Sequence, residues 1–211
     1  MLKSKSGIPA VPPEVFRISC SWMENTAMAF QFKTGVLTVS DKGYAGLRID
    51  ESGKAVSSLL ESSGFQVFFS HTVPDRVDSI IRVLTSWADE EKLSLIVTTG
   101  GTGLSPRDVT PQATEAVIDY AVPGIGEAMR ARSLSVTPHA ILSRAVAGVR
   151  GTCLIVNLPG STRGALENLE VVLPALAHGL AKLAGDTADC AGVDTGNTSP
   201  PATAGSEKLK Q

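Results

Sequence analysis

Apolar residues along the chain form short continuous runs that alternate with longer stretches in which they recur every three or four positions. Short, uninterrupted apolar runs that end at Gly, Ser, Asn or a charged residue predict buried β-strands. Such runs lie at 35–40, 65–69, 93–98, 145–148 and 152–157. The last two flank a predicted turn at Arg150–Gly151.

The stretches between these runs predict amphipathic helices. The clearest follows Pro74–Asp75, where apolar residues from Val77 to Ala88 recur at spacings of three and four. Pro174 lies inside the last predicted helix and is expected to bend or split it. The other predicted helices begin at Asp50 or Ser52, at Thr110–Pro111 (reaching Tyr120), at Ile125 after a break at Pro123–Gly124, and near Ser161.

This alternation of apolar strands and helices predicts an α/β fold. Strands that are apolar throughout are typical of a parallel sheet covered by helices on both faces, so we expect a three-layer α/β/α arrangement with a mostly parallel central sheet. Ligands of such folds bind beyond the carboxyl ends of the strands. Candidate residues at these ends are Ser40–Asp41, 71–75, 99–103 and 157–161.

The periodic pattern covers residues 34–185, which we interpret as one domain. Residues 1–33 contain three prolines and no clear periodicity, which predicts a poorly ordered extension. Residues 186–211 are rich in Gly, Ala, Ser, Thr and Pro, which predicts a disordered tail. Translation is expected to start at Met1, Met23 or Met28, which all precede the first strand.

Composition narrows the class of protein. The 211 residues are 43% hydrophobic and 19% charged, as in ordinary globular proteins, and a formal charge of −2 offers no general attraction to nucleic acid or anionic membranes. No apolar run is long enough to predict a membrane span or a secretory signal. Three cysteines without metal-binding spacing argue against a disulfide framework, so we expect a cytoplasmic protein; they are Cys20, Cys153 and Cys190.

Three glycines within four positions follow the strand predicted at 93–98. In Gly100–Gly103 they interrupt the chain where it leaves a buried strand, and Thr98, Thr99 and Thr102 add hydroxyl groups. One interpretation is a tight turn between a strand and a helix. The other is a nest of backbone N–H groups that binds phosphate. The threonines favour the second, although the segment matches neither a P-loop nor a dinucleotide-binding fingerprint.

Two aspartates are candidates for metal binding at neighbouring strand ends. Asp75 precedes the clearest helix, and Asp108 follows the glycine-rich segment. Each is also suited to capping a helix or turn. Beside a phosphate-binding loop, two carboxylates would suit Mg²⁺ bridged to polyphosphate oxygens. The two interpretations do not exclude each other.

Other polar residues are weaker candidates. Ser161, after Pro159–Gly160, would begin the last helix and offer an anion site or a simple cap. Ser143–Arg144 would present a guanidinium to phosphate or form a surface ion pair. The histidines lack metal-ligand spacing and are not expected to act in catalysis; they are His71, His139 and His178.

Several of these motifs together resemble one family. The segment TTGGTG-x₃-RDVTP-x-AT at 98–114 is similar to the signature of the molybdopterin adenylyltransferases of molybdenum cofactor synthesis, the MogA/MoaB-like family. The likeness covers about 34–185. Further matching segments are GVLTVSD at 35–41, VPD at 73–75, PGIGEAMR at 123–130, LSRAVAGVRG at 142–151 and NLPGS at 157–161.

The resemblance implies a trimeric enzyme in which the terminal phosphate of molybdopterin attacks the α-phosphate of Mg-ATP. The products would be adenylyl-molybdopterin, passed to a separate metal-insertion protein, and pyrophosphate. The family's two functional aspartates fall at Asp75 and Asp108, which would hold Mg²⁺, and its nucleotide loop falls at Thr99–Gly103. Its pterin and phosphate contacts fall at Ser40, Asp41, Ser143, Arg144, Pro159, Gly160 and Ser161.

Two alternatives to this activity remain. Related domains serve as non-catalytic pterin-binding or scaffold modules, and another occurs in hydrolases of pyrophosphate-containing nucleotides. A sister branch of the family shares TGGTG and a Pro–Gly–Ser–Thr turn but alters the Arg–Asp–Val–Thr segment. This chain retains Arg107–Thr110, which favours the active branch.

Overall fold

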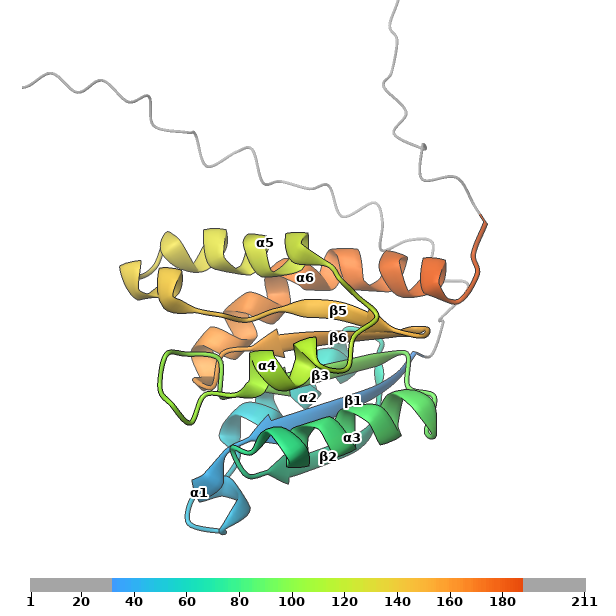
Figure 1. Ribbon diagram of the computed structural model, residues 1–211. Helices are drawn as coiled ribbons and strands as arrows, with labels where there is room; N and C mark the ends of the chain where they lie inside the picture. Colours follow the sequence, from blue (N-terminus) through green and yellow to red (C-terminus); the bar gives the residue numbers. More distant parts are fainter. Residues whose placement is uncertain (1–31, 188–211) are drawn as a thin grey trace, which may run out of the picture.

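The computed structural model describes residues 32–187 (Figure 1). The predicted extension and tail lie outside this range except for residues 32–33 and 186–187, and so do the possible start sites and two of the cysteines. The described part forms an α/β domain around one six-stranded sheet. None of its helices is long and apolar enough to cross a membrane.

The sheet has the strand order β2-β1-β3-β6-β5-β4. The four strands β2, β1, β3 and β6 are parallel, and β5 is antiparallel to β6 and to β4. The prediction of a mostly parallel sheet is therefore confirmed. The strands are β1 (Lys33–Val39), β2 (Gln66–Val73), β3 (Leu95–Thr99), β4 (Tyr120–Ala121), β5 (Ala147–Arg150) and β6 (Cys153–Leu158).

Helices cover both faces of this sheet. In Figure 1, α3 and α4 lie in front of the strands, while α2, α5 and α6 form the layer on the other side. The predicted three-layer α/β/α arrangement is thus confirmed. The helices are α1 (Asp41–Tyr44), α2 (Glu51–Ser62), α3 (Val77–Asp89), α4 (Thr110–Glu115), α5 (Pro123–Leu134), the 3₁₀ helix η3 (Pro138–Leu142) and α6 (Thr162–Leu183).

Side chains on neighbouring positions of each central strand enter two different cores. Ile96 packs under α3 and α4, whereas Leu95 and Val97 face the layer of α2 and α6. All residues of β3 and β6 are buried, which explains why both strands are mainly apolar. Edge strand β2 is half exposed, and its polar residues after Phe69 extend it beyond the predicted range.

Local boundaries differ from the predictions where polar or proline residues take part in regular structure. Pro123 begins α5 instead of breaking the chain, because the first helical turn needs no proline N–H. Tyr120 belongs to β4 and not to the preceding helix, which ends at Glu115. Helix α6 continues through Pro174 and is not split. The short elements α1, β4 and η3 lack a periodic pattern and were not predicted.

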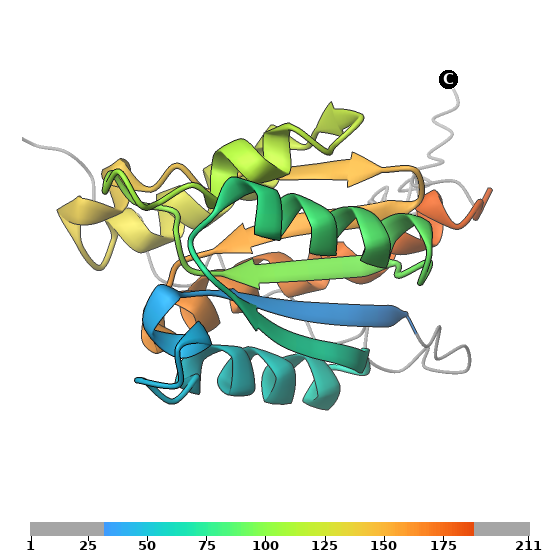
Figure 2. The same cartoon turned by 60° about the horizontal axis from the view of Figure 1, so that its bottom comes forward.

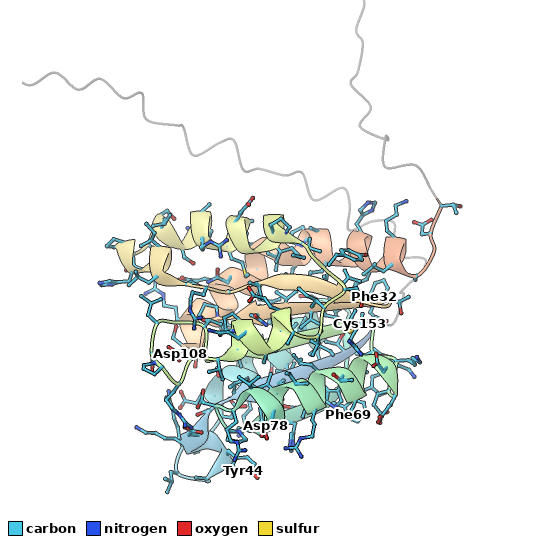
Figure 3. All side chains as sticks on the ribbon, viewed as in Figure 1. Phe32, Tyr44, Phe69, Asp78, Asp108 and Cys153 are labelled. Carbon is cyan, nitrogen blue, oxygen red and sulfur yellow. The ribbon has the colours of Figure 1, made fainter. Side chains whose placement is uncertain are left out.

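The parallel strands bring four connections to one end of the sheet. Figure 2 shows β1 and β3 running toward the end where α1 lies. In Figure 3, Asp108 lies at this end, and Phe32 and Cys153 lie at the opposite one. The candidate residues predicted beyond the strand ends therefore share one edge of the molecule.

Candidate active site

A cavity of about 400 Å³ opens at the carboxyl ends of β1, β2 and β3. Its lining includes Asp75 and Asp108, the glycines Gly100 and Gly101, and the start of α6 at Ser161. Two helices begin at this cavity. Asp50 caps α2 by accepting the N–H of Gly53 at 2.8 Å, and Ser161 caps α6 by accepting that of Gly164 at 3.3 Å. Helix N-termini carry partial positive charge that favours anions.

The glycine-rich loop needs glycine for two separate reasons. Gly100 and Gly101 have positive φ angles of 102° and 64°, which side chains rarely adopt. A Cβ atom at Gly100 would lie 2.3 Å from the carbonyl oxygen of Val39, and one at Gly101 would lie 2.4 Å from Thr110 Oγ1. The Thr110 hydroxyl also donates to the Gly100 carbonyl at 2.8 Å. The loop is therefore fixed by neighbours on β1 and α4.

This fixed loop leaves backbone donors available. Among residues 32–187, no hydrogen bond uses the N–H groups of Gly101, Thr102 or Gly103. The N–H of Gly100, in contrast, donates to the Leu158 carbonyl at 3.2 Å. Consecutive unpaired N–H groups after a strand form the kind of nest that accepts phosphate oxygens. This geometry favours the phosphate-binding interpretation over a plain turn.

Asp75 is joined to Asp41 by reciprocal hydrogen bonds. The N–H of Asp41 donates to Asp75 Oδ2 at 2.7 Å, and the N–H of Asp75 donates to Asp41 Oδ1 at 3.0 Å. The Asp41 carboxylate also pairs with the guanidinium of Arg107. The N-cap of α3 is Arg76, so Asp75 does not cap this helix, contrary to one interpretation of the sequence.

Asp108 is held by a loop that Arg144 fixes from the other side. Asp108 Oδ2 accepts the N–H of Ser105 at 2.8 Å, so this carboxylate does cap a turn. Arg144 Nε donates to the Gly103 carbonyl at 2.7 Å, and its Nη2 donates to the Asp108 carbonyl. The guanidinium that the sequence suggested for phosphate thus binds the two ends of the 103–108 segment.

The carboxylate of Asp75 lies near those of Asp41 and Asp108, and this proximity affects its pKa. Burial raises the pKa of Asp75, and the Asp41 and Asp108 charges add to the effect, while the Asp41 N–H and Arg107 oppose it. The pKa of Asp41 is lowered, chiefly by the N–H of Asp75 and then by Arg107. The ionised form of Asp75 is therefore less favourable than that of a free aspartate, and a bound cation would oppose this effect.

A second cavity, of about 280 Å³, lies on the other side of the glycine-rich loop. It is formed by α5, η3 and the start of α6. Thr102, Gly103, Pro159 and Ser161 separate it from the first cavity, and Ser161 lines both. Its remaining polar and apolar lining includes Met129, Arg130, Ser133, Val136, His139, Leu142, Ser143, Glu167 and Asn168.

The candidate residues predicted from the sequence divide between the two cavities. Asp75, Asp108, Ser40, Thr99, Gly100, Gly101 and Gly160 line the first, whereas Thr102, Gly103, Ser143 and Pro159 line the second. Asp41 and Arg144 line neither, since their side chains are bonded to Asp75, Arg107 and the loop carbonyls. The Thr99 hydroxyl donates to the Pro159 carbonyl at 2.8 Å and joins the two loops.

Three supporting residues have roles that the sequence analysis did not assign. Thr110 was expected to cap a helix, but its hydroxyl binds the glycine-rich loop. The buried Asn157 side chain donates to the hydroxyls of Thr98 and Thr114, at 3.0 and 2.9 Å. Arg48 lines the first cavity from the loop before α2. The sequence analysis placed Asn157 among the candidates at a strand end, but its hydroxyl partners are remote in the sequence.

The histidines and the described cysteine do not gather at a metal site. His71 is exposed on β2, His139 lines the second cavity, and His178 lies on α6. Burial raises the pKa of Cys153 to about 12, so this thiol remains protonated in the core. No group of three or more His, Cys, Asp or Glu side chains suited to a metal occurs between residues 32 and 187.

A search of protein families matches residues 35–178 to the family described as a probable molybdopterin binding domain. The chain belongs to this family. The matched residues span both cavities of the molybdopterin-binding domain and the loop between them.

Relatives of known name agree with this assignment. A molybdopterin adenylyltransferase from Helicobacter pylori (strain ATCC 700392 / 26695) is 44% identical over 146 residues, which cover 68% of this chain and 83% of that protein. Gephyrin from Dictyostelium discoideum is 43% identical over 156 residues, but the matched part of this chain covers only 22% of its length. The molybdopterin-binding domain thus also occurs within a much longer protein.

The fold of the domain agrees with solved structures. The crystal structure of the molybdopterin biosynthesis enzyme MoaB from Thermus thermophilus has a TM-score of 0.70 and 52% sequence identity, and covers 74% of this chain and 98% of that one. A structure of MogA has a TM-score of 0.68 and 37% identity, and covers 72% of this chain and 99% of that one.

Proposed function

We propose that this protein is a molybdopterin adenylyltransferase of molybdenum cofactor synthesis. It would join the terminal phosphate of molybdopterin to the α-phosphate of ATP, forming adenylyl-molybdopterin and releasing pyrophosphate. The observation that carries the proposal is the row of unpaired N–H groups at Gly101–Gly103, placed between two cavities and beside two carboxylates. The named relatives support the choice of substrates.

The first cavity suits the polyphosphate of ATP. The N–H of Gly101 in this cavity, and those of Thr102 and Gly103 at its boundary with the second, would donate to phosphate oxygens without rearrangement. The loop is already fixed by Thr110 and Arg144. The first turn of α6, which is capped by the uncharged Ser161, adds partial positive charge at the same place. Donors that are in position before the reaction lower its barrier without a cost of reorganisation.

Asp75 and Asp108 would hold Mg²⁺ in this cavity. Mg²⁺ is usually bound by one or two carboxylates together with substrate phosphates and water, so a complete protein ligand set is not required. The donor set fits, because both carboxylates line one cavity and an adjacent cation would offset the burial that raises the pKa of Asp75. When bound, Mg²⁺ would neutralise charge on the polyphosphate.

The second cavity suits the pterin. Its apolar lining, from Met129, Val136 and Leu142, would contact the flat faces of the ring, and side chains such as Ser133 and Asn168 would meet its polar edges. A substrate in this cavity would direct its phosphate toward the glycine-rich loop. The two phosphates would then meet near Ser161, which lines both cavities.

The reaction needs no general base under this scheme. A phosphate monoester is already largely deprotonated near neutral pH. The main obstacle is the mutual repulsion of two anions, which positioning and charge neutralisation overcome. This scheme requires no catalytic histidine.

The location, oligomeric state and partners of the protein are proposed as well. We infer a cytoplasmic homotrimer that delivers its product to a separate metal-insertion protein, without binding nucleic acid or membranes. The family resemblance is the ground for the trimer and for the partner.

A product assay tests the proposed function. Purified protein would be incubated with molybdopterin, ATP and Mg²⁺, and adenylyl-molybdopterin and pyrophosphate would be measured by chromatography. We expect both products in equal amounts, and neither without molybdopterin. ATP consumption without the pterin would instead identify a nucleotide hydrolase. Pterin binding without product would identify a non-catalytic binding module.

A further inference from the structure

The segment between α1 and α2 forms one wall of the first cavity. It turns at Gly46, whose φ is 71°, and then presents Arg48 and Ile49 before Asp50 caps α2. Both Arg48 and Ile49 line the cavity, although both are largely exposed to solvent. None of the motifs that carry the family resemblance includes Arg48.

Arg48 differs from every other arginine between residues 32 and 187. Its guanidinium has no hydrogen bond or ion pair within that range. Each of the others donates to a carboxylate, a carbonyl or a hydroxyl, and they are Arg76, Arg82, Arg107, Arg130, Arg132, Arg144, Arg150 and Arg163. An arginine with five free donors beside a polar cavity is well suited to bind an anion.

The charges that line the first cavity are mostly negative, so a polyphosphate would need a cationic partner there. Four carboxylates line the cavity, those of Asp50, Glu51, Asp75 and Asp108, and Arg48 is the only cationic side chain among the lining residues. A polyphosphate would add further negative charge. The other arginines near this end of the sheet do not line the cavity, and each has a partner elsewhere. Arg107 pairs with Asp41 and Arg144 binds loop carbonyls. Arg76 pairs with Asp78, and Arg163 pairs with Glu167.

The position of Arg48 indicates which phosphates it would meet. The phosphate that reacts must lie at the boundary between the two cavities, near the glycine-rich loop and Ser161. Arg48 lines only the first cavity, on the wall where α2 begins. With ATP in the first cavity and the pterin in the second, as proposed above, a side chain on that wall would face the part of the triphosphate that points away from the pterin.

We propose that Arg48 binds the two phosphates of ATP that leave as pyrophosphate. The inference rests on the proposed adenylyl transfer. In that reaction an oxygen of the pterin phosphate forms a bond to the α-phosphorus. The bond between the α-phosphorus and the oxygen bridging to the β-phosphorus breaks, and its electron pair stays on pyrophosphate. Arg48 stabilises this developing charge by charge-assisted hydrogen bonds.

Binding measurements on Arg48 variants test the proposal. We would titrate Mg-ATP, Mg-pyrophosphate and AMP into the wild-type protein and into Arg48→Ala, Arg48→Lys and Arg82→Ala by calorimetry. Arg82 is an exposed arginine on α3 and serves as the matched control. Arg48→Ala is expected to weaken binding of Mg-ATP and Mg-pyrophosphate about tenfold and to change AMP binding less than about twofold. Arg48→Lys should recover part of the loss, because a lysine keeps the charge but not the paired donors.

The possible outcomes separate this proposal from the proposed function. Wild-type protein that binds Mg-ATP, together with an Arg48→Ala variant of unchanged affinity for Mg-pyrophosphate, would overturn the assignment of Arg48 alone. An equal loss of AMP affinity would also overturn it, because the contact would then be to the α-phosphate or the nucleoside. Wild-type protein that binds no nucleotide would overturn both the function and this inference. Unfolding temperatures within about 1 °C of wild type would show that the variants are folded.

Discussion

The two cavities share the glycine-rich loop between them but differ in nearly every other respect. The larger one is lined by four carboxylates, one arginine and the first turns of two helices. The smaller one combines Met129, Val136 and Leu142 with scattered polar groups from α5, η3 and α6. One thus suits a metal-bound polyphosphate, and the other suits a flat heterocycle with polar edges.

The difference has a structural origin in the sheet. The larger cavity lies where parallel strands β1, β2 and β3 end together, so side chains remote in the sequence converge there. The smaller cavity lies beside the antiparallel part of the sheet, where η3 and the chain leading to β5 close over α5 and α6. A single edge therefore provides two chemically different sites, joined by residues 101–103. Mutations on each side should then affect different substrates.

The largest effect is expected for Asp108→Asn. Removing this charge would impair metal binding at the larger cavity, so kcat should fall about 100-fold while molybdopterin affinity stays within about twofold. Steady-state kinetics and direct pterin titration would measure the two quantities. Asp78→Asn, an exposed aspartate on α3, is the control. Unchanged turnover in Asp108→Asn would remove this carboxylate from the mechanism.

A smaller effect, on molybdopterin binding instead of turnover, is expected on the other side of the glycine-rich loop. Arg130 lines the smaller cavity and donates to the Ala145 carbonyl at 3.0 Å. Arg130→Gln should raise KM for molybdopterin about tenfold and leave KM for ATP nearly unchanged. Arg132→Gln, two positions along the same helix and outside the cavity, is the matched control. An effect on ATP in place of molybdopterin would reverse the assignment of the two cavities.

The smallest effect concerns stability and its dependence on pH. The raised pKa of Asp75 means that ionising this group costs folding free energy, so its contribution is most favourable below its unfolded pKa of 3.8 and is lost as pH rises through the folded value. Without divalent metal at pH 7.5, Asp75→Asn should therefore unfold about 2 °C higher than wild type. The difference should shrink near pH 4. A lower unfolding temperature for the variant at pH 7.5 would contradict this account of the charge cluster.

The sequence predicted those helices in which apolar residues recur every three or four positions and those strands in which they are consecutive. Strands such as β3 and helices such as α3 were recognised because their apolar residues fall on one face or are buried throughout. Short polar elements such as α1 and η3 carry no such signal. Edge strand β2 was predicted too short because its second half contains the polar residues Ser70, His71 and Thr72.

The candidate site was predictable in its location but not in its detailed contacts. Glycines after a buried strand and carboxylates at neighbouring strand ends identified the edge where the cavities lie. The partners of Arg144 and Thr110 depend on contacts across the fold, at separations that no local pattern encodes. Arg48 stands in an exposed loop whose sequence resembles any solvated turn. Its significance appears only when the partners of the other arginines are known.

Diffraction from crystals grown with Mn²⁺ and a non-hydrolysable ATP analogue would test the central claim most directly. The account predicts an anomalous Mn²⁺ peak at the carboxylates of Asp75 and Asp108, with phosphate oxygens on the N–H groups of Gly101–Gly103. It would be contradicted by a metal bound away from both aspartates, or by a triphosphate in the cavity lined by Arg130 and His139.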